Sequence, residues 1–158
     1  MPKSKKRVSS PLDDMSYLDL NNLDLDRAYS LREFEYISEQ LQNRPIKIKE
    51  EFVHHFERDK AGKLVPMPPT TFYKEAVVAE IACQLGNWNA VTKQGGVVTT
   101  SQGGFKINNA GEIRAPDVAF VSKEICRRLS DRQIWTFQGE AFSPTFVVEV
   151  DDFDNIQG

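Results

Sequence analysis

Two acidic residues stand in otherwise apolar runs of the sequence that have the character of β-strands. Asp117 lies in the run RAPDVAFV, residues 114–121, and Glu149 lies in the run PTFVVEV, residues 144–150. A carboxylate in such a run loses hydration, which is costly unless a metal ion, a cationic side chain or several hydrogen-bond donors replace the water. The pattern predicts that the fold brings both acids together, with a divalent-metal site as the first hypothesis.

Helical spacing points to a third acid. Residues 72–91 have the strongest helical pattern of the chain. Its apolar stripe consists of Val77, Ile81, Leu85 and Trp88. At about 100° per residue, Glu80 falls at the edge of this stripe, whereas Glu75 faces away from it. Glu80 can therefore reach a buried site, although ordinary structural hydrogen bonding explains Glu80 and its neighbour Gln84 equally well.

The N-terminal segment differs in composition from the rest. Residues 1–26 combine a basic start, KSKKR at 3–7, with an acidic, Asn-rich stretch, and they show no regular apolar period. We expect a disordered polar tail over 1–26, followed by one folded domain over 27–158. The basic cluster is either a nuclear import signal or part of a solvating tail.

A helix and a hairpin are predicted next. Ser30 is a suitable N-cap, and Glu33 three residues later completes a capping box. The following helix should end at Asn43, before a proline. Strands are expected at 52–57 and 63–67. His54 and His55 would point to opposite faces of such a strand, so they cannot bind the same metal ion.

The elements after the long helix alternate between short strands and one helix. Strand-like runs occur at 97–101, at 105–107 and around Asp117, and glycine and asparagine separate them. Residues 122–132 are compatible with a short helix, and the Glu149 run gives the last strand. The order helix-strand-strand-strand-helix-strand predicts an α/β protein of the α+β type.

Composition limits the classes of protein. The chain has 158 residues, of which 40% are apolar, which suits one domain with a sizeable core. No apolar run approaches the roughly 20 residues that span a bilayer, and the charged N-terminus lacks a hydrophobic signal segment. We expect an intracellular protein without a membrane anchor, nuclear or cytoplasmic. The net charge of −3 means that any contact with nucleic acid must use a local basic surface or bound cations.

The ordered motifs resemble one known family. They are LVPMPPT at 64–70, LGNW at 85–88, PDVAFV at 116–121 and VVEV at 147–150. In this order and spacing they resemble the Uma-two family of restriction endonuclease-like proteins, part of the wider PD-(D/E)XK nuclease fold. The resemblance covers residues 45–151 and implies a mixed sheet flanked by helices.

The resemblance also implies a metal site and a DNA substrate. Asp117 matches the family's metal-binding aspartate, and Glu149 matches the acid on the next core strand. The backbone carbonyl of Val150 matches the main-chain ligand, and Glu80 looks like an additional carboxylate supplied by a helix. Such hard oxygen ligands suit Mg²⁺ or Mn²⁺. A homodimer is implied only by analogy with enzymes that cut both strands.

One part of the family's apparatus is missing from the sequence. In the short motif of the wider nuclease fold a lysine follows the acid by two positions, where this chain has Asp151, and no lysine follows Lys123. Relatives often supply that lysine from a later helix, so we expect a domain shortened at its C-terminal end, at Gly158. Lys106, on a neighbouring predicted strand, is one substitute for the missing lysine. The alternative is that its side chain simply faces solvent. Two classes of function stay open. One is a metal-dependent DNA endonuclease, and the other is an inactive relative that serves as a binding or regulatory module, or else a shortened product of little stability.

Overall fold

Helices and separate β-sheets make up the protein. A computed structural model describes residues 15–151. The helices are the 3₁₀-helix η2 (Leu20–Asn22), α1 (Leu31–Asn43), α2 (Phe72–Val91), α3 (Lys123–Arg128) and α4 (Asp131–Trp135). The strands are β1 (Ile46–Ile48), β2 (Glu51–Val53), β3 (His55–Arg58), β4 (Leu64–Met67), β5 (Val97–Thr100), β6 (Phe105–Lys106), β7 (Ile113–Arg114), β8 (Val118–Val121) and β9 (Phe146–Val148). This combination confirms the predicted α+β class.

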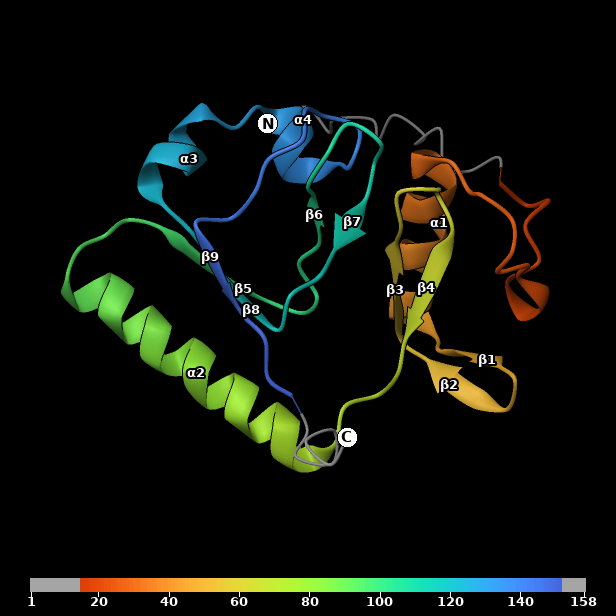
Figure 1. The fold of residues 1–158 in the computed structure, drawn as a ribbon, viewed down its shortest axis with the longest axis horizontal. Coiled ribbons are helices and arrows are strands. Elements are labelled where there is room, and N and C mark those ends of the chain that lie inside the picture. The colour runs from red at the N-terminus through yellow and green to blue at the C-terminus, as the bar shows by residue number, and fades with distance from the viewer. Residues whose placement is uncertain (1–14, 152–158) are drawn as a thin grey trace, which may run out of the picture.

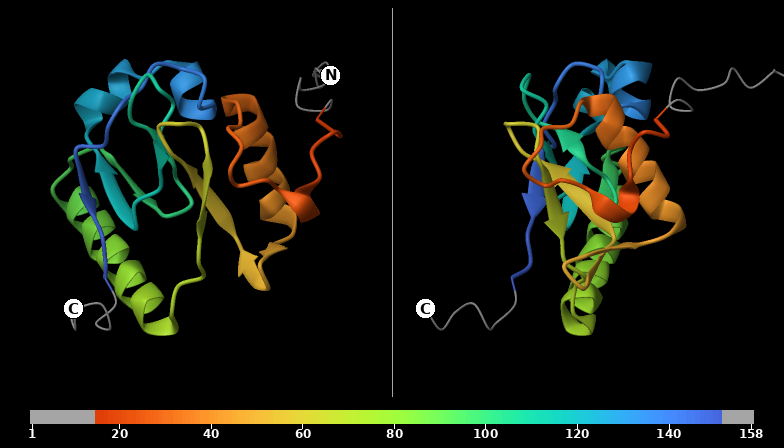
Figure 2. Two further views of the ribbon diagram at one scale, coloured as in Figure 1. Left: turned by 45° about the vertical axis from the view of Figure 1, so that its right-hand side comes forward. Right: turned by 90° about the vertical axis from the view of Figure 1, so that its right-hand side faces the viewer.

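The strands form three sheets. β1 pairs with β2, a second sheet has the order β4-β3-β7-β6, and a third has the order β5-β8-β9. Every pairing between the described strands is antiparallel. Figure 1 shows α2 running along the β5-β8-β9 sheet and α1 beside β3 and β4. The turned views in Figure 2 show the same arrangement, with α3 and α4 at the opposite end from the start of α2.

Local sequence signals account for the two long helices. The hydroxyl of Ser30 accepts the Glu33 N–H, and the Glu33 carboxylate accepts the Ser30 N–H, which is the predicted capping box. The N-cap of α2 is Thr71, whose hydroxyl accepts the Lys74 N–H, and α2 covers the predicted residues 72–91. Within residues 15–151, no helix is both long and apolar enough to cross a membrane.

The predicted hairpin is confirmed from His55 to Met67, but not over the start of its first strand. β3 and β4 pair in antiparallel register, with Phe56 opposite Pro66. The first strand, expected to be continuous over 52–57, is interrupted at His54, because β2 ends at Val53 and pairs with β1. The interruption leaves His54 exposed and His55 half-buried.

The predicted helix over 122–132 is divided into two. Ser122 caps α3, and Ser130 then begins α4 with its own capping box, in which Gln133 takes part. A serine that accepts a backbone N–H competes with continuation of the preceding helix, which explains the break.

One apolar cluster joins the N-terminal segment to α1 and the first strands. Its buried members are Leu18, Leu20, Tyr29, Phe34, Ile37, Leu41, Ile46, Val53, Phe56, Leu64 and Ile113. The burial of Leu18 and Leu20 corrects the expectation of a disordered tail for residues 15–26. Leu18 lies outside any helix or strand, and Leu20 begins the three-residue η2, so neither belongs to an element long enough to show an apolar period. Residues 1–14, with the basic cluster, lie outside the described residues.

A second group of contacts holds the β5-β8-β9 sheet. On one face, Phe105, Ala119 and Val121 are buried together. On the face toward α2, the ring of Phe120 contacts Trp88 at 5.2 Å and Phe146 at 5.3 Å between centroids. These contacts fix β8 between the helix and the neighbouring strand β9.

Candidate active site

Antiparallel pairing of β8 and β9 brings the two predicted acids together. Val118 stands opposite Val148 in the ladder, so Asp117, one residue before β8, stands opposite Glu149, one residue after β9. Both acids therefore lie at the same end of the sheet. They line one cavity of about 560 Å³.

Asp117 is the buried member of the pair, 8% exposed. Its Oδ2 atom accepts a hydrogen bond of 2.8 Å from the Val150 N–H. The ammonium of Lys74 lies 3.7 Å from the same oxygen. The carboxylate thus has a hydrogen-bond donor from the backbone just after β9 and a cation from α2. Such partners are expected for a charge removed from water.

Glu149 is exposed, which corrects the expectation that both acids are buried. The physical reason is the position of β9, which has β8 as its only partner among the described strands. Partial loss of hydration around the carboxylate raises the pKa of Glu149, and the negative charge of Asp117 raises it further. Glu57 adds a smaller effect in the same direction.

Glu57 is a third acid of this cavity, and the sequence reasoning missed it. It lies on β3, is 9% exposed, and accepts the Ala115 N–H at 2.8 Å. The guanidinium of Arg114 lies 4.0 Å from it. The available signal was an acidic residue in the strand predicted over 52–57, but nothing local shows that β3 lies beside the Asp117 segment.

Lys74 was missed as well, because the motifs of the nuclease fold place the lysine after Glu149, whereas Lys74 precedes both Asp117 and Glu149 in the chain. Lys74 lies in the first turn of α2 and lines the cavity with Asp117 and Glu149. Arg114 also lines it, although its side chain is 54% exposed and its guanidinium is held by Glu112 at 2.8 Å.

Glu80 does not belong to the cavity. It is exposed on α2, where its carboxylate accepts a hydrogen bond of 3.0 Å from Gln84. The side of α2 that faces the sheet differs from the predicted apolar stripe. Val78 is 3% exposed, whereas Val77, a residue of that stripe, is 42% exposed. Lys74, which does face Asp117, is separated from Glu80 by six residues, or about 120° around the helix. Apolar residues occur all around α2, so their spacing could not fix its orientation.

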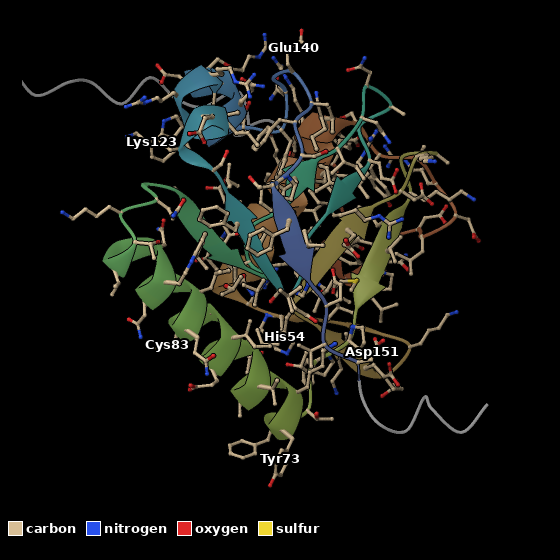
Figure 3. All side chains as sticks on the ribbon, turned by 60° about the vertical axis from the view of Figure 1, so that its left-hand side comes forward. His54, Tyr73, Cys83, Lys123, Glu140 and Asp151 are labelled. Atoms are coloured by element: carbon tan, nitrogen blue, oxygen red, sulfur yellow. The ribbon has the colours of Figure 1, made fainter. Side chains whose placement is uncertain are left out.

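Lys106 and His54 line a different, larger cavity of about 870 Å³. His55, Ser101 and Ala115 line both cavities, so the two adjoin there. Burial lowers the pKa of His55, with the charge of Glu57 acting against it. Lys123, the last lysine of the sequence, lies toward the opposite end of the sheet from Asp151 (Figure 3).

The donors at Asp117 and Glu149 fit a magnesium-like ion. Within residues 15–151, no group of three or more His, Cys, Asp or Glu side chains is arranged to hold a metal. Mg²⁺, however, usually takes one or two carboxylates from a protein and keeps several waters. The raised pKa of Glu149 agrees with this, because a cation would relieve its repulsion from Asp117. The Val150 carbonyl as a ligand stays a prediction, since the contact observed is through its N–H.

Comparison with known proteins identifies a family. The model of the Uma2 family, described as "Putative restriction endonuclease", matches residues 34–155. No curated protein matches the chain.

Proposed function

Because the chain belongs to the Uma2 family of restriction endonuclease-like proteins, we propose that it is an Mg²⁺- or Mn²⁺-dependent endonuclease that hydrolyses DNA phosphodiester bonds. The supporting observation is the cavity in which Asp117 and Glu149, from neighbouring strands, lie with a lysine. Carboxylates next to a basic group are the side chains that phosphoryl transfer with a metal ion requires.

Each side chain has a distinct task in this proposal. Asp117 and Glu149 hold the ion, which, when bound, lowers the pKa of a water molecule and neutralises phosphate charge. The Val150 N–H orients the Asp117 carboxylate. Lys74 and Arg114 supply local positive charge, which a chain of net charge −3 needs at the point where it meets a polyanion.

The alternative is an inactive relative that binds without cleaving. The observation in its favour is Asp151, an acid at the position where the family pattern has a lysine. A homodimer and an intracellular location also stay predictions.

Metal binding and cleavage need separate experiments. Calorimetric titration with Mn²⁺ should show binding to the wild type. Asp117→Ala removes one of the two carboxylates and should bind at least tenfold more weakly, a loss of about 1.4 kcal/mol in binding free energy. Glu80→Ala is the matched control and should bind Mn²⁺ like the wild type. Identical titrations of the wild type and Asp117→Ala would overturn the metal site.

Cleavage is tested with supercoiled plasmid in Mn²⁺. The wild type should nick or linearise the plasmid, and Glu149→Ala should not. Equal cleavage by both proteins would indicate a contaminating nuclease, and Mn²⁺ binding without cleavage would favour the binding module.

A further inference from the structure

Lys74 occupies an unusual place for a lysine. Its side chain is only 22% exposed, and its ammonium lies 3.7 Å from the Oδ2 atom of Asp117. It is the only lysine lining this cavity among the described residues.

Helix stability does not explain this position. Lys74 is in the first turn of α2, with its N–H bonded to the capping hydroxyl of Thr71. The positive end of the helix dipole lies there and disfavours a cation. The favourable interaction of the ammonium comes instead from Asp117, a residue of the candidate site.

The other basic side chains nearby are less suitable. Lys106 lines the larger cavity and not the one that holds Asp117 and Glu149. Arg114 lines the right cavity, but Glu112 holds its guanidinium with two contacts of 2.8 and 2.9 Å. Lys74 has a flexible four-carbon stem and three donors, and its only ion pair among the described residues is with the site itself.

We propose that Lys74, supplied by α2, is the basic group of the active site and takes the place of the lysine that the sequence lacks at Asp151. This inference rests on the proposed nuclease function. In the metal-free protein the Lys74 ammonium neutralises Asp117. With Asp117 engaged in holding a metal ion, the Lys74 ammonium would be free to donate hydrogen bonds to a non-bridging oxygen of the scissile phosphate.

The proposal predicts two effects of opposite sign. Removing the charge in Lys74→Met should tighten Mn²⁺ binding about tenfold, because a cation close to the carboxylate no longer competes. The same change should slow plasmid cleavage at least about a hundredfold, the usual effect of losing one group that stabilises charge in a transition state. Lys74→Arg keeps the charge and should recover part of the cleavage rate, while its Mn²⁺ affinity stays near that of the wild type.

The experiment measures Mn²⁺ affinity by calorimetry and plasmid cleavage in Mn²⁺, with circular dichroism to check folding. Lys93→Met is the control, since Lys93 is exposed and outside the cavity, and it should leave both quantities unchanged. Lys74→Gln is the second neutral variant and replaces Lys74→Met if that protein does not fold.

The outcomes separate this inference from the function on which it rests. A neutral variant that cleaves like the wild type, or that loses metal affinity together with cleavage, overturns the role of Lys74 alone. A wild type that binds Mn²⁺ without cleaving, or that binds none, overturns the nuclease function and the role of Lys74 with it.

Discussion

Glu149→Gln tests whether the cavity stores unfavourable electrostatic energy, and we expect it to stabilise the metal-free protein at neutral pH. Partial burial and then the charge of Asp117 raise the pKa of Glu149, so the ionised side chain is less stable in the folded protein than in the unfolded chain. Glutamine has nearly the same shape and no charge. The substitution therefore removes the penalty without opening a void.

The exposure of Glu149 limits the size of the effect. Water screens an exposed charge, and interactions between exposed charges contribute about 0–1 kcal/mol. We expect the free energy of unfolding to rise by about 0.5–1 kcal/mol, which for a chain of this size raises Tm by about 1–4 °C.

The pH dependence follows from the direction of the shift. A raised acid pKa means that the folded state binds the proton more readily, so the stability of the wild type falls as pH rises from the unfolded value of 4.5 through the folded pKa. The difference between Glu149→Gln and the wild type should be full above the folded pKa and should vanish below pH 4.5. Thermal unfolding followed by circular dichroism in EDTA, at several pH values on both sides of 4.5, measures it.

Glu80→Gln is the control, because Glu80 is exposed, outside the cavity, and accepts its hydrogen bond through an oxygen that glutamine retains. It should leave Tm nearly unchanged at every pH. A Glu149→Gln protein that is less stable than the wild type at neutral pH would refute the reasoning, because it would mean that the ionised carboxylate is favoured in the folded state.

Two glycines give predictions of opposite sign, both measured by urea unfolding. Gly96→Ala should lower the free energy of unfolding by about 1–3 kcal/mol, because its new Cβ would lie 2.4 Å from the Phe120 ring and 2.6 Å from the Val121 carbonyl oxygen. Unchanged stability of Gly96→Ala would contradict the close approach of this segment to β8. Gly86→Ala should raise the free energy of unfolding by about 0.5–1 kcal/mol, since Gly86 lies inside α2 and nothing lies within 4 Å of the added carbon. A destabilised Gly86→Ala would mean that α2 is not continuous through this residue.

The parts of the fold that the sequence predicts are those with local signals. The capping box of Ser30 and Glu33 marks the start of α1, and the apolar residues of 72–91 mark α2. The break at His54 has no such signal, because it arises when β2 pairs with β1 and β3 pairs with β4 and β7. Strand partners are set by long-range contacts, which periodicity does not contain.

The same distinction applies to the candidate site, where local signals predict some residues and long-range contacts bring in the others. Asp117 and Glu149 are conspicuous because each is an acid in an apolar run, and the pairing of β8 with β9 places them opposite one another. Glu57 and Lys74 come from β3 and α2, and only the folded chain brings them to the same cavity. Glu80 was misplaced because α2 has apolar residues on several sides, so their spacing predicts the length of the helix but not which side faces the sheet.

The charges of the cavity bear on what it can bind. Among residues 15–151, three acids line it, Glu57, Asp117 and Glu149, against one lysine, Lys74. Arg114 lies 2.8 Å from Glu112, outside the cavity, and 4.0 Å from Glu57, inside it, and counting Arg114 together with Glu112 leaves the balance unchanged. The excess of two negative charges equals the charge of one divalent cation. Loss of hydration raises the pKa of Glu149, and the charges of Asp117 and Glu57 raise it further. A single Mg²⁺ or Mn²⁺ would balance these charges, and it would do so without a lysine at position 151.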